Sequence, residues 1–195
     1  MNRVSKPPEI RKQEILDEAK KQFLENGYEK TSMTDIASAI NVTEGLCYRY
    51  FKSKQELFQK VIDQYVEDCY RQFVPVVSDS SMSIEERLNS NFQILKKIET
   101  PNGMNHYFHD KKNQTMHFQI IFRIVNKLLE AFEKVLVKEK GKETIHIDNP
   151  ADMARFIMFG SLGVLLGDST DYEKKQRITN YIFKVLDYCP NEGKK

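Results

Sequence analysis

The stretch that decides the fold is SMTDIASAINVTEGLCYRYFKSK, residues 32–54. Ser32 followed three residues later by Asp35 is the pattern of a capping box, so a short helix is expected to begin there. A tight turn follows, and Thr43 then caps a second short helix that ends near Phe51. The stretch therefore predicts two short helices joined by a turn, the helix-turn-helix arrangement whose second helix enters the major groove of DNA.

The second short helix, predicted over about 43–51, has an inward and an outward face. At 100° per residue, Cys47 and Phe51 point in nearly the same direction, toward a small core. The outward face then consists of Gly45, Leu46, Tyr48 and Arg49. A glycine permits close approach of the backbone, the arginine can bind a guanine or a phosphate, and tyrosine hydroxyls can reach phosphates or base edges.

Three further residues flank this outward face. Tyr50 also carries a phenolic hydroxyl, and Lys54 stands at the start of the next helix, where unpaired N–H groups favour an anion. Glu44 fits less easily, because a carboxylate repels phosphates, although it can accept a hydrogen bond from the amino group of cytosine. The alternative is that this tyrosine-rich helix packs against another part of the protein.

The rest of the chain also has helical periodicity and recurrent capping patterns, which predict an all-α fold of eight or nine helices. A helix-turn-helix DNA-binding domain is expected over 1–54 and a helical-bundle domain for effector binding and dimerisation over 55–195. Outside the opening stretch, helices are predicted over about 8–26, 53–75, 83–99, 114–139, 150–167 and 170–189.

Charge and cysteine usage limit the partners and the compartment. The chain has 195 residues and a net charge of +2, and this excess lies in residues 1–54, which hold ten Lys/Arg and eight Asp/Glu. Most of it is in the leading arm, at Arg3, Lys6, Arg11 and Lys12. Three scattered cysteines without CxxC spacing indicate no disulfide framework or zinc site. With no signal peptide and no membrane-length apolar segment, we expect a cytoplasmic protein.

Residues 15–62, ILDEAKKQFLENGYEKTSMTDIASAINVTEGLCYRYFKSKQELFQKVI, resemble the DNA-binding domain of the TetR/AcrR family of bacterial transcriptional regulators. The resemblance lies in F-x-E-x-GY-x-x-T, in the IA pair at 36–37, and in V-[ST]-x-G-x-x-Y-x-YF-x-[SN]-K-x-x-L. It implies a homodimer that binds a roughly palindromic operator with its third helix in the major groove.

The resemblance also assigns roles to individual positions. The DNA-contacting positions of the family correspond here to Thr34, Thr43, Gly45, Tyr48, Tyr50 and Lys54. Sequence preference is expected from the positions that vary within the family, which are Glu44, Leu46 and Arg49. Cys47 stands where the family usually has leucine, and this smaller side chain predicts a slightly looser domain.

The family usually places a small-molecule pocket in its C-terminal bundle. The candidate lining residues are Phe92, Met104, Phe108, Phe118, Phe122 and Met158. Because few charges accompany them, an apolar or aromatic ligand is expected. The alternative is that these residues form an ordinary core.

A dimer interface is predicted on the last two helices, where the family has its own. The candidate residues are the small-residue face Gly160, Gly163 and Gly167 and the apolar stripe Ile178, Ile182 and Val185. The alternative is packing of these residues within one subunit.

The leading functional hypothesis is a repressor that leaves its operator when a small ligand binds. The alternative is a DNA-binding protein without a small-molecule effector, used in chromosome organisation or controlled by a protein partner. No GxSxG, HExxH, P-loop or Rossmann pattern is present, so an enzyme is not expected. His106 and His109 have a spacing that could share a metal, but a solvated connector explains them better, and no metal or cofactor is predicted.

Overall fold

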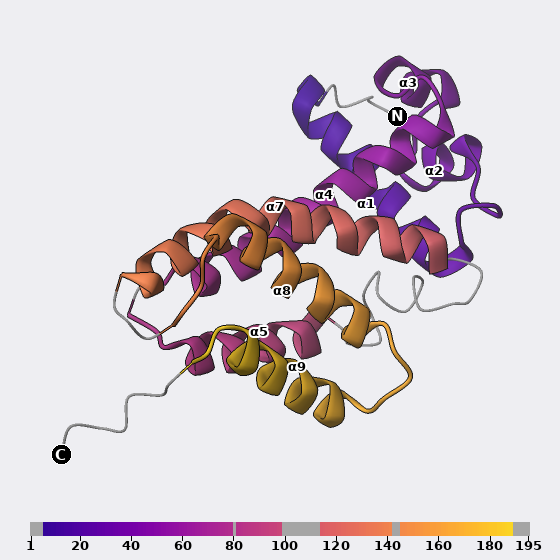
Figure 1. Cartoon of the computed structure of the whole chain (residues 1–195). Helices are drawn as coiled ribbons and strands as arrows, with labels where there is room; N and C mark the ends of the chain where they lie inside the picture. Colours follow the sequence, from indigo (N-terminus) through magenta and orange to yellow (C-terminus); the bar gives the residue numbers. More distant parts are fainter. Residues whose placement is uncertain (1–5, 80, 99–113, 142–144, 189–195) are drawn as a thin grey trace. The chain divides into compact units, whose positions relative to one another are not determined.

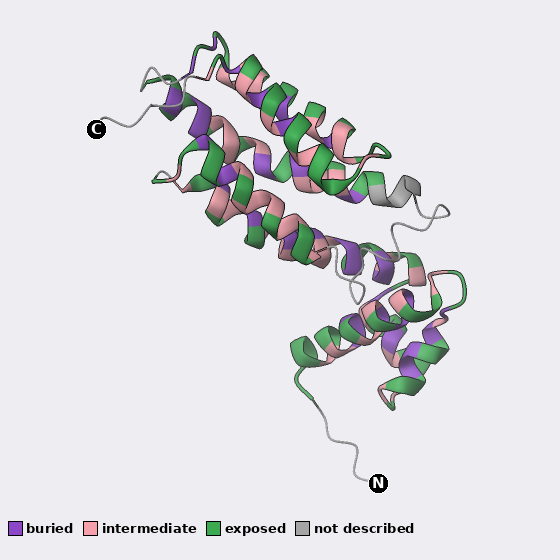
Figure 2. Ribbon diagram, turned by 90° about the horizontal axis from the view of Figure 1, so that it is seen from below, coloured by how far each residue is buried: buried purple, intermediate pink, exposed green. Residues whose placement is uncertain are grey.

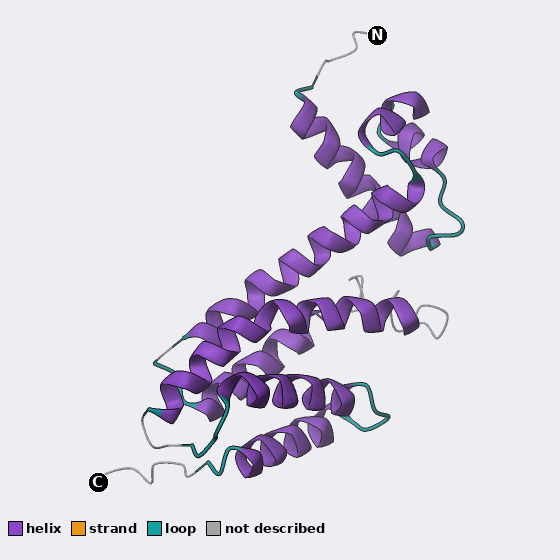
Figure 3. Cartoon of the chain, turned by 45° about the horizontal axis from the view of Figure 1, so that its top comes forward, coloured by secondary structure: helices purple, strands orange, loops and turns teal. Residues whose placement is uncertain are grey.

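The structure is a computed structural model that describes residues 6–79, 81–98, 114–141 and 145–188, with the side chains of 114–117 excepted. All regular secondary structure in these ranges is α-helical (Figure 3), as the sequence predicts. The helices are α1 (Pro8–Asn26), α2 (Met33–Ala39), α3 (Glu44–Tyr50), α4 (Lys54–Ser78), α5 (Ile84–Ile98), α7 (Gln114–Lys140), α8 (Pro150–Leu165) and α9 (Asp171–Val185), labelled in Figure 1.

The described residues divide into two compact units, and the boundary between them falls inside α4, between Glu67 and Asp68. The first unit contains α1, α2, α3 and the first half of α4. The second contains the rest of α4 together with α5, α7, α8 and α9. In both units the buried residues follow one side of each helix (Figure 2), as expected for amphipathic helices around a core.

The two short helices of the first unit are held by their ends. The predicted capping box is present on α2, where the Ser32 hydroxyl accepts from the Asp35 N–H and the Asp35 carboxylate accepts from the Ser32 N–H. At the other end, Asn41 adopts the left-handed conformation with φ 59°, and the Val42 N–H donates to Ala37 O at 2.9 Å. This is a Schellman motif with asparagine in the position that glycine most often occupies, and it makes the turn into α3.

The GYxxT segment between α1 and α2 ties the first unit together. Gly27 ends α1 with φ 84°, a conformation that side chains other than glycine rarely adopt. The buried Thr31 hydroxyl donates to Gln22 O at 3.2 Å and lies 2.9 Å from Gly27 O. The ring of Tyr28 packs on Phe58 of α4 with 4.7 Å between centroids.

One apolar core cluster of the second unit takes residues from each of its helices after α4. Its buried residues are Ile84, Leu136, Ile145, Ile147, Ala154, Ile157, Ile178, Ile182 and Leu186. Asn149 caps α8 through its side chain and Pro150 is the first helical residue, as predicted. Thr170 and Glu173 form the predicted capping box of α9.

The predicted end of the fourth helix near Pro75 is wrong, because α4 continues to Ser78 with this proline inside it. A proline in a helix interior costs about 3 kcal/mol. Phe73 and Val77 on either side of it are both buried. Burial of two such side chains contributes about 1.5–3 kcal/mol each, which is enough to offset the proline.

The last helix also ends earlier than the predicted residue 189. α9 ends at Val185, and Asp187 takes φ 47°. The Tyr188 N–H donates to Phe183 O at 2.9 Å, and the rings of these two residues lie 4.8 Å apart. A second Schellman motif, with the apolar contact that often accompanies it, therefore stops the helix where the sequence offers no glycine.

Candidate nucleic-acid interface

The helix α3 has the two faces that its sequence predicts. Cys47 and Phe51 are fully buried and anchor the helix to the core of the first unit. Gly45, Tyr48 and Arg49 are exposed on the other side. Leu46 and Tyr50 are half-buried at the margins of this face, and Thr34 is exposed at the second residue of α2. The helix-turn-helix thus presents a short, rigidly held surface to a partner.

Gly45 leaves open space above α3. A Cβ built at this position would meet no atom within 4 Å, and the backbone has ordinary helical geometry there. Neither packing nor backbone conformation within the chain therefore requires glycine at this position. Glycine in a helix costs about 0.5–1 kcal/mol relative to alanine. Close approach of an external surface, such as the floor of a DNA groove, would account for this residue.

Thr43 and Glu44 begin α3. The Thr43 carbonyl accepts from the Leu46 N–H at 2.9 Å, but its hydroxyl makes no capping hydrogen bond. The position predicted for the cap is therefore right, whereas the exposed hydroxyl remains available to a partner. Burial raises the pKa of the Cys47 thiol, and the nearby Glu44 carboxylate raises it further. The thiol is thus protonated at neutral pH and acts as a small apolar side chain.

Lys54, the first residue of α4, is already engaged within the chain. Its Nζ donates to Tyr28 O at 3.0 Å and lies 4.3 Å from the centroid of the Tyr28 ring. An ammonium has three N–H donors, so two of them remain for a phosphate. Sequence analysis missed this contact, because the two residues are 26 positions apart. The only sequence signal for the contact is that Tyr28 and Lys54 both belong to the family motif.

The basic arm carries less free charge than its sequence indicates. Lys6 Nζ lies 2.7 Å from Glu14 Oε1, and Arg11 Nη1 lies 2.5 Å from Glu14 Oε2. Lys12 is exposed, and Arg3 lies outside the described residues. One carboxylate on α1 therefore pairs with two of the four arm cations.

The predicted ligand-lining residues are not gathered around one cavity in the described part of the chain. Phe92 is half-buried against the core cluster, and Met158 is half-buried on α8. Phe118 and Phe122 are exposed on α7, where the Phe122 ring lies 5.4 Å from that of Phe159. Met104 and Phe108 lie outside the described residues.

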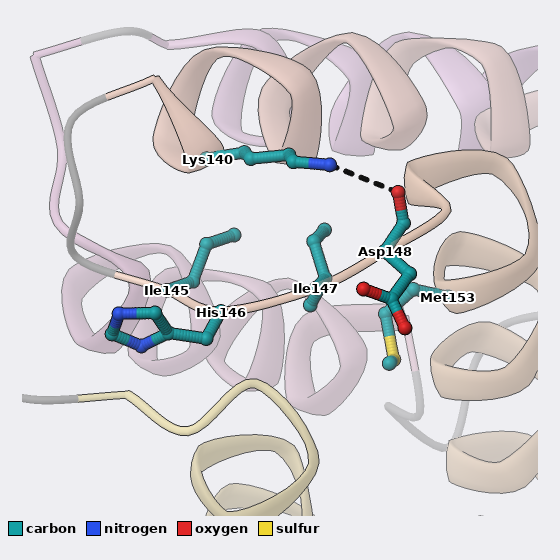
Figure 4. A pocket seen from close by; sticks show the side chains of 6 residues that line it. All are labelled: Lys140, Ile145, His146, Ile147, Asp148 and Met153. Carbon is teal, nitrogen blue, oxygen red and sulfur yellow. Dashed lines mark hydrogen bonds between the residues drawn. The ribbon is translucent and has the colours of Figure 1, made fainter.

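Two cavities of the second unit have other linings. One, of about 700 Å³, lies at the segment that leads into α8 and is lined by Lys140, Ile145, His146, Ile147, Asp148 and Met153. Figure 4 shows Lys140 Nζ donating across it to Asp148 O, at 2.9 Å. The other, of about 370 Å³, has walls from α4, α5 and α7. Three helices line the second cavity, which is open to solvent, whereas a single loop supplies most of the lining of the first.

The predicted dimer residues fall into two groups. Gly160 and Gly163 are exposed on α8, and a Cβ added at either would meet nothing within 4 Å; Gly167 is exposed just beyond the helix. Ile178 and Ile182 are instead buried in the protomer's own core, and Val185 is half-buried beside them. The apolar stripe of α9 thus packs within one chain, and the small-residue face of α8 does not.

Exposed aromatic side chains on the last two helices were missed in the sequence. Phe156 of α8 is 64% exposed, and Tyr172 and Tyr181 of α9 are 72% and 53% exposed. Helical periodicity places these three residues outside the buried stripes of α8 and α9, and that is the only sequence signal of their exposure. Large exposed aromatic residues beside small ones are typical of surfaces that a partner covers.

These features define the class of the protein: it is an all-α, helix-turn-helix DNA-binding protein. Residues 15–61 match the family model described as bacterial regulatory proteins, tetR family. The matched segment spans the helix-turn-helix, and the curated relatives found in the comparisons are transcriptional regulators.

Relatives and solved structures extend the likeness beyond the matched segment. The transcriptional repressor DhaR of Mycobacterium sp. (strain GP1) is 24% identical over 161 residues, which cover 80% of each chain. Other curated repressors, such as KstR2 of Rhodococcus jostii, align over less than half of their own length. A TetR-family regulator from Mesorhizobium loti superposes with a TM-score of 0.67 at 17% identity, covering 92% of this chain and 98% of that one.

A structure of RolR in complex with resorcinol has a TM-score of 0.62 to this chain at 15% identity, covering 92% of this chain and 89% of that one. At such low identity these superpositions show that the fold is shared, including the helical second unit.

The described ranges contain neither a membrane-spanning helix nor a cluster of metal ligands. No helix there is long and apolar enough to cross a lipid bilayer. Nor do those residues include a group of three or more His, Cys, Asp or Glu side chains placed to hold a metal ion. His106 and His109, the spacing considered for a metal, lie outside the described residues.

Proposed function

We propose that this regulator is a repressor that binds a roughly palindromic operator as a homodimer and leaves it when a small molecule binds the second unit. In this proposal, residues 1–54 bind DNA and residues 55–195 bind the effector and the partner subunit. The observation that carries the DNA-binding role is the outward face of α3, where Gly45, Tyr48 and Arg49 are exposed while Cys47 and Phe51 hold the helix.

Each residue of this face has a role in the proposed complex. Gly45 lets the backbone approach the groove, and Arg49 donates to a guanine or a phosphate. Tyr48 and Tyr50, with Thr34, Thr43 and Lys54 around them, contact the DNA backbone and fix the register of the helix on it. Glu44 and Leu46 contribute to the choice of operator sequence.

Dimerisation through α8 would bring two copies of α3 to successive turns of one face of DNA. Half-sites on such an operator lie about 34–36 Å apart, one helical turn of B-DNA. The support for this surface is that Gly160 and Gly163 leave open space in a helix whose other side is buried. Exposed Phe156 and Tyr181 supply apolar area beside them.

Release by a small molecule is supported by two observations. The second unit contains an open cavity of about 370 Å³ between α4, α5 and α7, within the usual volume range for small-molecule sites. A protein of the same fold, RolR, has been crystallised with resorcinol. We expect an effector with an apolar or aromatic body, which shifts the dimer toward a state with lower affinity for the operator.

The test is fluorescence anisotropy with the DNA upstream of the chain's own gene. Tyr48→Ala and Arg49→Ala should each weaken binding by about tenfold or more, which corresponds to about 1.4 kcal/mol or more. Lys96→Ala, which removes an exposed cation near the end of α5, is the matched control and should leave affinity unchanged. Binding should also weaken steeply with salt if several phosphates are contacted.

Unchanged binding by both α3 variants would contradict the assigned face. If operator binding is normal but no compound of a broad panel alters it, the alternative of a DNA-binding protein without a small-molecule effector is favoured.

A further inference from the structure

The open cavity between α4, α5 and α7 of the second unit is cationic. Its lining consists of Tyr70, Val74 and Ser78 from α4, Arg87 from α5, and Lys127, Glu130, Ala131, Lys134, Val135 and Lys138 from α7. Four cationic groups and one carboxylate therefore face a space of about 370 Å³. Lys134 pairs with Glu130 at 2.7 Å, so that carboxylate is already matched by one lysine. Arg87 also forms an ion pair with the buried Glu139, so the positive charge that remains lies on α7, where it favours an anionic occupant.

Arg87 is the buried member of this set and is only 5% exposed. Its Nε donates to Asp79 O at 3.0 Å, and its Nη2 donates to the same carbonyl. These bonds hold the guanidinium in place against the segment that joins α4 to α5. The third nitrogen, Nη1, is buried but has no hydrogen-bond acceptor.

Glu139 does not satisfy this nitrogen. Its Oε1 lies 3.8 Å from Arg87 Nη1, close enough for an ion pair but too far for a hydrogen bond. A buried donor without an acceptor costs about 1–3 kcal/mol. Arg87 Nη1 thus retains donors in the wall of the cavity, where an oxygen of a bound anion could accept from them.

The other walls are apolar. Val135 is buried, and Val74 and Ala131 are half-buried, around a space that also includes the ring of Tyr70. Lys127 Nζ lies 4.7 Å from the centroid of that ring, so its charge is held beside the apolar wall. Inorganic phosphate would fill the cationic part of this cavity but would leave its apolar wall uncovered.

From this combination we infer that the effector of the proposed regulator is a small organic acid: a carboxylate on an apolar or aromatic body. The carboxylate accepts from Arg87 Nη1 and is neutralised by the lysines of α7, while the body lies against Val74, Ala131 and Val135. The inference rests on the proposed function for its regulatory meaning, but the binding site itself does not depend on DNA binding. It adds a charged group to the apolar or aromatic ligand expected from the sequence.

The experiment measures the melting temperature of the full chain, without DNA, at constant ionic strength. The probes are benzoate and phenylacetate, each compared with its uncharged amide, and inorganic phosphate. A carboxylate at saturation should raise the melting temperature by about 2–4 °C. The amide and phosphate should raise it by less than half as much, because each lacks one of the two features that the cavity recognises.

Two variants and one control place the effect at this cavity. Lys138 is exposed and has no ion-pair partner within the described residues, so Lys138→Gln should weaken carboxylate binding about threefold to tenfold without loss of folding. Lys184→Gln, on the exposed side of α9, removes the same charge elsewhere and should bind the probes as wild type does. Arg87→Lys retains the charge but removes Nη1, and should abolish the difference between carboxylate and amide.

Equal shifts with carboxylate and amide, or none with either, would overturn the inference. So would identical behaviour of Lys138→Gln and Lys184→Gln, which would assign the effect to net charge alone. An equal shift in melting temperature with phosphate would show that the site recognises charge alone and does not recognise an organic body.

A parallel anisotropy measurement with the upstream DNA separates this inference from the proposed function. Normal DNA binding with no carboxylate effect removes the inference and leaves the DNA-binding role in place. A carboxylate that binds a chain without operator affinity removes the proposed function instead.

Discussion

At the scale of single residues, the clearest functional sign is a residue that the chain itself does not need. Gly45 weakens a helix of only seven residues and relieves no clash within the described structure. Gly27, by contrast, has φ 84° and is required by its own backbone. Two glycines of the same domain therefore have different roles: the backbone conformation requires Gly27, whereas Gly45 is explained by the surface that α3 presents.

This difference predicts opposite effects of Gly45→Ala on stability and on binding. The added methyl enters open space and improves helix propensity, so the free energy of unfolding should rise by about 0.5–1 kcal/mol. Operator affinity should fall by about tenfold, because the methyl separates α3 from the groove. Urea unfolding and anisotropy measure the two quantities.

The control for this substitution is Asn126→Ala, at an exposed position of α7, which should stabilise the chain without affecting DNA binding. A Gly45→Ala protein that binds DNA as tightly as wild type would show that no close approach occurs at this position.

At the scale of elements, the helices are defined by their ends more than by helical propensity. Capping boxes begin α2 and α9, and Ser83 with Glu86 makes the same reciprocal pair of bonds before α5. Ser53 makes half of such a box: its Oγ accepts from the Glu56 N–H, but the Glu56 carboxylate accepts from the Lys52 N–H instead of the Ser53 N–H.

The capping carboxylates predict a specific response to acid. Hydrogen bonds from the Ser32 hydroxyl and N–H lower the pKa of Asp35 below its ordinary value of about 4. A lowered pKa in the folded state means that this carboxylate stabilises the protein above that ordinary value and loses its contribution as the pH falls through the folded-state pKa. Asp35→Asn should therefore destabilise the first unit at pH 7 but hardly at all at pH 2.

Urea unfolding at a series of pH values, followed by a probe in the first unit, checks this response. Glu29→Gln removes an exposed carboxylate of the same unit that belongs to no capping box, and its acid response should resemble that of wild type. A difference between wild type and Asp35→Asn that stays constant from pH 7 to pH 2 would contradict a role for the charged form.

At the scale of the whole molecule, the second unit has a filled core and an open face on the same pair of helices. Ile178 and Ile182 complete the core cluster, whereas Gly160 and Gly163 of α8 face open space. The helix pair predicted as an interface thus has its apolar stripe engaged internally. What remains for a partner is the small-residue face and the exposed aromatic residues beside it.

This arrangement makes Gly163→Leu a selective test of dimerisation. The Cβ of the new side chain meets nothing within 4 Å and leucine improves helix propensity, so the fold should be retained. It would prevent close approach of a second α8, and we expect a monomer by light scattering together with a loss of operator affinity of about tenfold or more.

Asn126→Leu adds the same side chain at an exposed position of α7 and should leave the dimer intact. A Gly163→Leu protein that remains a dimer with full operator affinity would place the interface elsewhere.

Much of this protein is readable in its sequence because the signals are local. Capping boxes, helical stripes and the turn at Asn41 involve residues within a few positions of one another, so the all-α fold and the two faces of α3 follow directly. The error at Pro75 arose where packing prevailed over a local signal, and the error at the end of α9 arose where a Schellman motif formed without the glycine that usually marks it. Burial of Phe73 and Val77 continues α4, and the contact of Phe183 with Tyr188 ends α9.

Other features exist only in the tertiary structure. Lys54 meets Tyr28 across 26 residues, and Arg87 of α5 comes to share one cavity with lysines of α7 about 40–50 positions later. Charges and rings that are far apart in sequence become neighbours only when helices pack, and no periodicity within one helix encodes that meeting. The sequence by itself determined which helices form and which face of α3 is presented, whereas the tertiary structure decided which cations surround a common space.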